Sequence, residues 1–176
     1  MTEKDTYKQI YQMLDSVSPL SYDCGSLCDS ICCSNDPFTD DESYIYLLPG
    51  EWEYLRSEGC NADVSKEKCS EHYLPASWGE YVYIMHCPGA AGCDRRFRPI
   101  QCRTFPLTPH LKKKGVLEMI LCDTDLPYVC PLIREKMTLR DDFVETTLKA
   151  WKILIEDKAI RDLVKLDSKE RKRRPQ

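Results

Sequence analysis

Cysteine is the residue type that most constrains this sequence, because four of its 11 cysteines fall between Cys24 and Cys33. A single cysteine is often a small buried core residue, but packing alone does not explain four within so short a segment. A tetrahedral zinc site needs four sulfurs at about 2.3 Å, and an iron–sulfur cluster also needs several converging thiolates. The clustering therefore predicts a segment whose thiolates bind metal.

The first residues indicate the cellular compartment. The sequence Met-Thr-Glu-Lys-Asp is charged and lacks the apolar core of a secretion signal. No stretch approaches the roughly 18 apolar residues of a membrane span, so we expect a cytoplasmic protein without a membrane partner. Disulfides are not maintained in the cytosol, which favours metal ligation or redox chemistry for the cysteines. The alternative, a small secreted disulfide scaffold, needs a signal peptide and is usually shorter than about 100 residues.

The charge balance gives no overall attraction to polyanions. The chain has 25 Lys and Arg against 29 Asp and Glu, for a net charge of -4. We therefore expect metal ions as ligands and no nucleic-acid partner. Residues 169–176 form a basic run that we interpret as a solvated tail, with weak RNA contact as the alternative.

Apolar spacing predicts several helices and short strands. Residues 2–17 are predicted to form one amphipathic helix with Thr2 at its start, and residues 138–164 the C-terminal helix, started by Thr138 and Asp141. Ile160, Leu163 and Val164 either continue this helix or form one more short helix. Short strands are predicted at 44–48, 81–84 and 116–121, and a short helix at 51–58. Residues 60–75 are predicted to be a polar excursion without regular structure.

The expected fold is a small α+β domain, mainly helical, that spans residues 1–168 and is followed by the tail 169–176. Its two long helices are predicted to pack around an irregular, metal-stabilised, cysteine-rich centre formed by about residues 20–133. The side chains expected to be buried are Tyr7, Ile10, Leu14, Phe143, Leu148, Trp151 and Leu154.

A second group of cysteines extends the pattern. The first segment reads Cys24-Gly-Ser-Leu-Cys28-Asp-Ser-Ile-Cys32-Cys33, and Cys87, Cys93 and Arg98-Pro99-Ile100-Gln101-Cys102-Arg103 follow. These motifs resemble the YkgJ-like cysteine-cluster family, whose CxxCxxCC domain is described as zinc- or iron-chelating. The Cys130-Pro131 pair resembles the last cysteine of the family, so the resemblance covers about residues 20 to 133. Each CxxC spacing of the family is CxxxC here.

The resemblance implies eight thiolate ligands, which is too many for one four-coordinate zinc ion. The count favours two sites, one cluster and one ion, or bridging thiolates. The eight candidate ligands are Cys24, Cys28, Cys32, Cys33, Cys87, Cys93, Cys102 and Cys130.

Other residues near these motifs have weaker assignments. Arg98 and Arg103 flank Cys102, where they can offset thiolate charge, although each can equally have a local structural role. Pro99 is expected to set a turn or a helix start ahead of Cys102. His86 is more often a surface residue than a ligand in such a position. The remaining cysteines, Cys60, Cys69 and Cys122, are left open as accessory or free thiols.

The sequence thus predicts a cytosolic metal-binding protein, with zinc as the expected ion and an iron–sulfur cluster as the alternative. HExxH, GxSxG, GxxxxGK[ST] and GxGxxG motifs are absent from the sequence, and whether the protein is an enzyme stays open. The resemblance extends to flagellin lysine methylases, so an iron–sulfur redox or protein-modification enzyme, or an accessory to one, is the first alternative. A metal buffer or chaperone is the second. The sequence identifies no protein partner.

Overall fold

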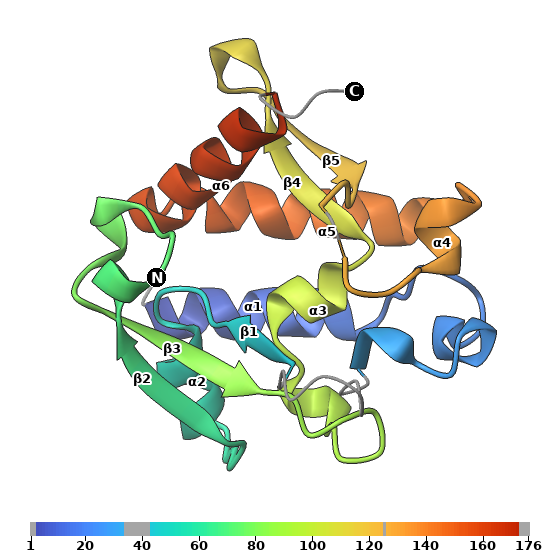
Figure 1. Ribbon diagram of the computed structural model, residues 1–176, viewed down its shortest axis with the longest axis horizontal. Helices are drawn as coiled ribbons and strands as arrows, with labels where there is room; N and C mark the ends of the chain where they lie inside the picture. The colour runs from blue at the N-terminus through green and yellow to red at the C-terminus, as the bar shows by residue number, and fades with distance from the viewer. Residues whose placement is uncertain (1–2, 34–42, 125, 173–176) are drawn as a thin grey trace.

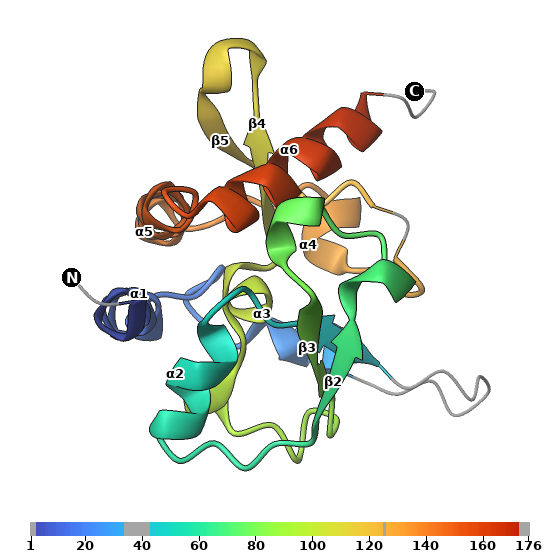
Figure 2. The ribbon, with the colours of Figure 1, turned by 90° about the vertical axis from the view of Figure 1, so that its left-hand side faces the viewer.

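The computed structural model describes residues 3–33, 43–124 and 126–172 of the chain. Two long helices, α1 (Glu3–Asp15) and α5 (Asp141–Leu154), pack side by side in both views (Figures 1 and 2). A three-stranded sheet and a separate β-hairpin complete one small domain. The expected α+β, mainly helical class is confirmed. Within the described residues, the helices are too short or too polar to cross a membrane.

The apolar stripes of the two long helices form much of the core, as the sequence predicted. Six of the seven predicted core side chains are buried, namely Tyr7, Ile10, Leu14, Phe143, Trp151 and Leu154. The prediction for Leu148 is wrong, because this side chain is only half-buried. Thr147 is fully buried in its place, since the face of α5 that meets α1 runs through residues 143, 147, 150, 151 and 154. Thr2, the predicted helix start, lies outside the described residues.

The three-stranded sheet is antiparallel and has the order β1 (Tyr44–Tyr46), β3 (Tyr81–His86), β2 (Val64–Lys68). The predicted strands at 44–48 and 81–84 correspond to β1 and β3, and the predicted helix at 51–58 is α2 (Glu51–Ser57). Strand β2 lies in the segment predicted to be a polar excursion, so that prediction is wrong. Its sequence Val-Ser-Lys-Glu-Lys carries almost no apolar signal, and its pairing with β3 is what makes it a strand.

The β-hairpin pairs β4 (Leu107–Leu111) with β5 (Leu117–Leu121) and projects from the body in Figure 2. Strand β5 was predicted, whereas β4 was not, because Pro109 lies at its centre. Proline is tolerated on an edge strand that needs no donor at that position. At the end of β4, the backbone N–H of Leu111 donates to the hydroxyl of Ser168 at 2.9 Å. This bond fastens the hairpin to the C-terminal helix, which contains Ser168.

The C-terminal helix predicted over 138–164 is two helices, so of the two alternatives for residues 160–164 the separate helix is confirmed. α5 ends at Leu154, and α6 (Lys158–Arg171) begins after Asp157. The Asp157 carboxylate accepts hydrogen bonds from the N–H groups of Ala159 and Ile160, so it acts as an N-cap that starts a new helix. Helix α6 also takes up residues 169–171 of the predicted tail, while residues 173–176 lie outside the described part.

A fully buried carboxylate, Glu51, joins three segments next to the core. Its Oε1 atom accepts from the Tyr11 hydroxyl and from the N–H of Ile100, both at 2.8 Å, and Oε2 accepts from the N–H of Leu48 at 2.9 Å. Ile100 begins the short helix α3 (Ile100–Thr104), which follows Pro99 as expected. Glu51 therefore fixes α3 against α1 and against the start of α2.

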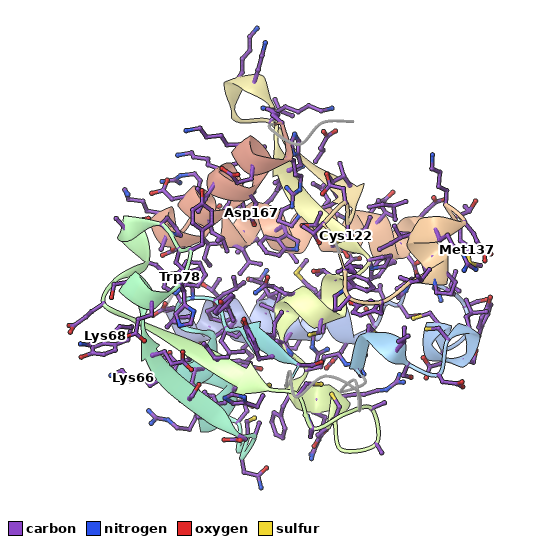
Figure 3. All side chains as sticks on the ribbon, viewed as in Figure 1. Lys66, Lys68, Trp78, Cys122, Met137 and Asp167 are labelled. Carbon is purple, nitrogen blue, oxygen red and sulfur yellow. The ribbon has the colours of Figure 1, made fainter. Side chains whose placement is uncertain are left out.

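The centre of the domain is filled by hydrophobic side chains (Figure 3). The larger cluster joins α1, α2, β3, α5 and α6, and a smaller one surrounds Phe143, Leu132 and Leu107. The two turns that contain Cys24 to Cys33 contribute no buried residue. The cysteine-rich segments therefore lie beside this core rather than at its centre, which corrects the expected arrangement of the helices around a cysteine-rich centre.

Replacing the buried carboxylate tests its role. Glu51→Gln keeps the shape but sets an amide N–H₂ against at least one backbone or hydroxyl donor, and we expect a loss of about 2 kcal/mol of unfolding free energy. Glu53→Gln, on the exposed face of the same helix, is the matched control and should change stability by less than about 0.5 kcal/mol. Urea unfolding followed by circular dichroism measures both, and equal stabilities would contradict this role.

Candidate metal centre

The eight candidate ligands are carried by short elements in the right-hand half of Figure 1. Cys24 and Cys28 begin and end the 3₁₀ turn η1 (Cys24–Leu27), and Cys32 and Cys33 lie in η2 (Ile31–Cys33). Cys87 follows the end of β3, and Cys93 lies in the loop after it. Cys102 is in α3, and Cys130 precedes α4 (Pro131–Arg134).

The segment from Cys24 to Cys33 is not one helix, so its thiols do not share a single helical face. Asp29 and Ser30 have φ angles of 50° and 56°, which is the left-handed region, and they separate the two turns. The N–H of Ser30 donates to the carbonyl of Gly25 at 2.9 Å. A Cβ on Gly25 would lie 2.4 Å from the Ser30 hydroxyl oxygen, so only glycine fits this turn. The local reversal turns the chain between η1 and η2, and Cys32 still lies close enough to Cys24 and Cys28 to interact with them.

The two cysteine segments meet at Cys33 and Cys87. The Cys33 and Cys87 thiols interact directly, and the Cys87 Sγ atom also lies 3.9 Å from the Cys33 carbonyl oxygen. The Sγ atoms of Cys32 and Cys33 are 3.9 Å apart. Two thiolates on one tetrahedral zinc ion are roughly 3.8 Å apart, so sulfurs of this pair already have that separation.

The other candidate thiols lie close enough to one another, or to Cys33 and Cys87, to shift one another's pKa values. Cys24 lies close enough to Cys28 and Cys130 for both to affect its pKa, which is raised by desolvation first and then by Asp23 and these thiols. Cys102 is influenced in the same way by Cys33 and Cys87. Desolvation by the surrounding protein is the main cause that raises the Cys102 pKa to about 12.

Arg98 lies among these thiols. Its guanidinium lies close enough to Cys93, Cys33 and Cys102 for these thiols to raise its pKa. Its Nε atom is buried and has no hydrogen-bond partner within the described part of the chain, and no acidic side chain described there forms an ion pair with it. Desolvation lowers the Arg98 pKa, but the thiols outweigh it and the net shift is upward.

Arg103, the second arginine of the motif, has a structural role instead. Its guanidinium donates to the carbonyls of Arg98 and Arg95, both at 2.7 Å, and pairs with the Asp15 carboxylate. It also lies over the Tyr11 ring at 4.7 Å. Arg103 therefore holds the loop that carries Cys93 against α1, and of the two arginines Arg98 is the one that faces the thiols.

Of the cysteines left open by the sequence, Cys60 and Cys69 are separate from this cluster, whereas Cys122 lines one pocket with Tyr128 and Cys130. Cys60 and Cys69 are buried in the hydrophobic core on either side of β2. Cys122 follows β5 (labelled in Figure 3), and its thiol contacts the Thr124 hydroxyl at 3.0 Å. His86 forms a hydrogen bond from its ring to the Ser65 hydroxyl at 3.2 Å.

One residue near the thiols had no signal in the sequence. Tyr128 interacts with Cys32, Cys102 and Cys130, and desolvation followed by these thiols raises its pKa. It lies in a loop between two cysteines without any periodic pattern, so only the fold could bring it to this position. Its ring covers one side of the cluster.

The donor chemistry fits a soft metal ion, because all eight cysteines are free thiols and the cation Arg98 interacts with three of them. As the side chains stand, no three His, Cys, Asp or Glu residues of the described ranges form a group that could hold a metal. Binding would therefore need the thiols to rotate from their present orientations toward a common centre.

No family model, curated protein or solved structure matches this chain. The resemblance to the YkgJ-like family therefore rests on the spacing of the cysteines and on the Arg-Pro-Ile-Gln-Cys-Arg motif.

The thiols should differ in their reactivity in the reduced, metal-free protein. The Cys33 thiol donates a hydrogen bond that lowers the pKa of the exposed Cys32, whereas its contact with Cys87 raises the pKa of that thiol. Because the thiolate is the nucleophile, alkylation of Cys32 should reach its half-maximal rate at a lower pH than that of Cys87. Peptide mass spectrometry after iodoacetamide pulses measures this order, with buried Cys60 as the unreactive control. The reverse order would contradict the hydrogen-bond assignment.

Proposed function

We propose that this protein binds metal ions through the eight clustered thiolates, with zinc as the expected ion and an iron–sulfur cluster as the alternative. The observation that carries this proposal is the gathering of thiols around Arg98, a half-buried cation with a buried Nε atom, whose pKa Cys93, Cys33 and Cys102 raise. A charge removed from water is stable only when it is paired. Neutral thiols do not provide that counter-charge, whereas thiolates do.

A metal ion explains how thiolates would exist here at neutral pH. Desolvation and neighbouring thiols raise the pKa values of Cys24, Cys87 and Cys102, so the metal-free cluster is largely protonated. A coordinated metal deprotonates its thiols, and a zinc ion with four thiolates has a net charge near -2. Arg98 would then be the cation that offsets this charge.

The contacts support a division of the eight thiols into two groups of four. Cys32 interacts with Cys24 and Cys28, whereas its neighbour Cys33 interacts with Cys87. The Sγ atoms of Cys32 and Cys33 are 3.9 Å apart, so in this division the two thiolates would lie where the two groups meet. The first proposed group is Cys24, Cys28, Cys32 and Cys130, and the second is Cys33, Cys87, Cys93 and Cys102.

Two four-thiolate sites would give a binding or structural role. Zinc in such a site has no redox chemistry and keeps no open position for water or substrate. The turns η1 and η2 contain no buried residue, so few packing contacts hold them in place. A metal in the proposed groups would join these turns to α3 and to the end of β3. The ions would thus stabilise the cysteine-rich segments beside the hydrophobic core.

Exposure favours a second candidate function, a metal buffer or chaperone. Cys32, in the first proposed group, is an exposed residue. An incoming thiol can reach an exposed thiolate and displace it, which speeds exchange of the ion. Exchange of bound zinc with a chelating dye distinguishes the two roles, since a structural site should release its ion over hours or more and a buffer within minutes.

Metal content tests the proposal directly. Protein purified without oxygen should contain about two zinc ions per chain by elemental analysis, or iron with matching sulfide and a brown colour if a cluster is the native form. Cys130→Ser and Cys87→Ser should each lose about one of the two ions. Cys60→Ala, a buried cysteine of the hydrophobic core, is the control and should keep both. Protein that contains neither zinc nor iron after growth with each metal would contradict the proposal.

The role of Arg98 is tested by its charge. Arg98→Met keeps the length but removes the cation, and zinc affinity should fall about 10- to 100-fold, as for other residues that support metal ligands. Arg95→Met, an exposed arginine of the same loop, is the control and should bind zinc like the unchanged protein. Competition with a chelator of known affinity gives both values. Equal affinities would show that Arg98 does not balance thiolate charge.

A further inference from the structure

A lysine-rich surface lies between the tip of the β4–β5 hairpin and helix α6, away from the cysteines (Figure 1). It surrounds a groove of about 220 Å³ whose floor includes Leu111, Gly115 and Ser168. We call it the hairpin–helix surface, and its lysines are Lys112, Lys113, Lys114, Lys165, Lys169 and Lys172.

Four of these lysines have no neutralising partner. Lys112 pairs with Glu118 and Lys165 with Asp162, but none of the other four forms an ion pair within the described residues; these are Lys113, Lys114, Lys169 and Lys172. All four are exposed. Most acidic side chains on or beside α6 have other partners: Asp162 pairs with Lys158 and Lys165, Asp123 pairs with Arg171, and Glu170 bonds to Tyr73. Asp167, also in α6, interacts with Arg171. The surface therefore has an excess of positive charge on a protein whose net charge is -4.

Two further observations support this positive field. The pKa of His110 in β4 is lowered by desolvation and then by Arg171 and Lys172, with Glu118 and Asp123 acting in the opposite direction. The sequence also continues with Arg173 and Arg174 directly after α6, outside the described residues. Cations thus extend from the hairpin tip along the last turns of the helix.

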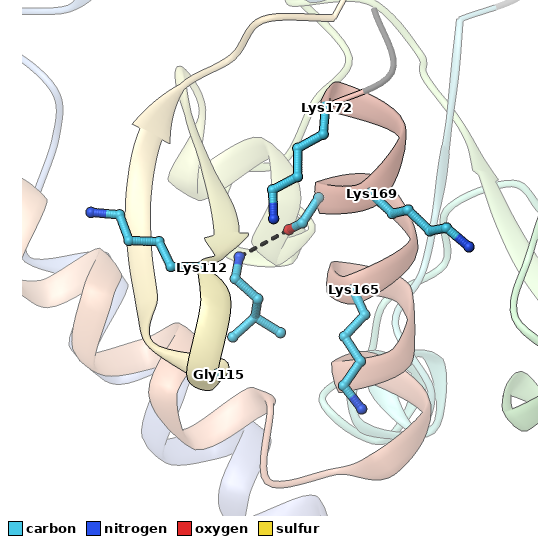
Figure 4. Close-up of a pocket in the computed structure, with 7 residues that line it drawn as sticks. Lys112, Gly115, Lys165, Lys169 and Lys172 are labelled. Carbon is cyan, nitrogen blue, oxygen red and sulfur yellow. Dashed lines mark hydrogen bonds between the residues drawn. The ribbon is translucent and has the colours of Figure 1, made fainter.

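The arrangement of the lysines indicates an extended anion. In Figure 4, Lys112 and Lys169 point in opposite directions from the groove, and Lys165 and Lys172 point along the helix. A single small anion would contact only some of these lysines. Duplex nucleic acid has one charge per about 1.7 Å of its axis and can meet all of it.

The neighbouring side chains favour a duplex over other polyanions. The groove is lined without an aromatic residue, so single strands would find no ring on which to stack. Val116 is the exposed large apolar residue at the hairpin tip, which is too little for insertion into a membrane. The hairpin projects as a two-stranded ribbon, and the major groove of B-form DNA, about 12 Å wide, admits such a ribbon. The corresponding groove of duplex RNA is too narrow.

We propose that the hairpin–helix surface binds the phosphate backbone of duplex DNA without sequence preference. The lysine tip of the hairpin would enter the major groove, and Lys169 and Lys172 would contact the flanking phosphates. This surface is independent of the proposed thiolate sites. The net charge of -4 led us to expect no nucleic-acid partner, but it does not show where the charges lie. The lysines of this surface are concentrated at one place.

Fluorescence anisotropy with the full-length, metal-loaded protein and a labelled duplex of about 20 base pairs tests this proposal. Four phosphate contacts predict a slope of about -3.6 for log K against log salt, or a loss of about 150-fold between 50 and 200 mM. Replacing Lys113, Lys114, Lys169 and Lys172 by Gln should weaken binding at 50 mM salt on the order of 100-fold.

A variant with the same change in net charge is the control. Replacing the exposed lysines Lys4, Lys8, Lys149 and Lys152 by Gln should leave the affinity within about threefold of the unchanged protein. Circular dichroism and metal content confirm that both variants fold. Equal losses in the two variants, a salt-independent affinity, or no binding would overturn the proposal. So would tighter binding to duplex RNA, polyglutamate or vesicles of anionic lipid than to DNA.

Discussion

The buried carboxylate of Glu51 is the interaction on which the arrangement of this protein depends. It accepts three hydrogen bonds, one each from α1, from the chain before α2 and from the start of α3. Desolvation raises its pKa, while these donors and the nearby Arg103 lower it in part. Leaving any of these donors without an acceptor in the core would cost more than an ordinary hydrogen bond contributes. The position of α3 is therefore fixed by a polar contact inside an apolar core.

That contact also explains how the thiols are brought together. Helix α3 contains Cys102, and the loop before it contains Cys93 and Arg98. Arg103 fastens the same loop to α1 through Asp15 and through carbonyls of the loop itself. The second cysteine segment is thus held by the apolar core and by polar contacts around it. Only the turns between Cys24 and Cys33 lack such support, so the proposed metal ions would act mainly on that segment.

The two proposed sites differ in their chemistry and in their place in the fold. The thiol cluster is a soft donor set with one cation, Arg98, whereas the hairpin–helix surface consists of hard, solvated ammonium groups. The separation follows from topology: α6 and the β4–β5 hairpin pack against each other through Leu111 and Ser168, at the opposite end of the chain's fold from the turns that contain Cys24 to Cys33. A protein with a net negative charge can in this way present a local positive surface.

The sequence by itself determined the long helices and the strands with strong patterns, because the spacing of Tyr7, Ile10 and Leu14 or the run from Tyr81 to Ile84 is a local signal. It also identified the eight cysteines that the fold gathers, through their density and motif. Only the tertiary structure decided the rest. Strand β2 and strand β4 exist because a partner strand pairs with them, and the break at Asp157 depends on a cap within a continuous apolar pattern. The separate roles of Arg98 and Arg103, and the excess of lysine charge at one end, come from contacts between residues far apart in the chain, which no local pattern encodes.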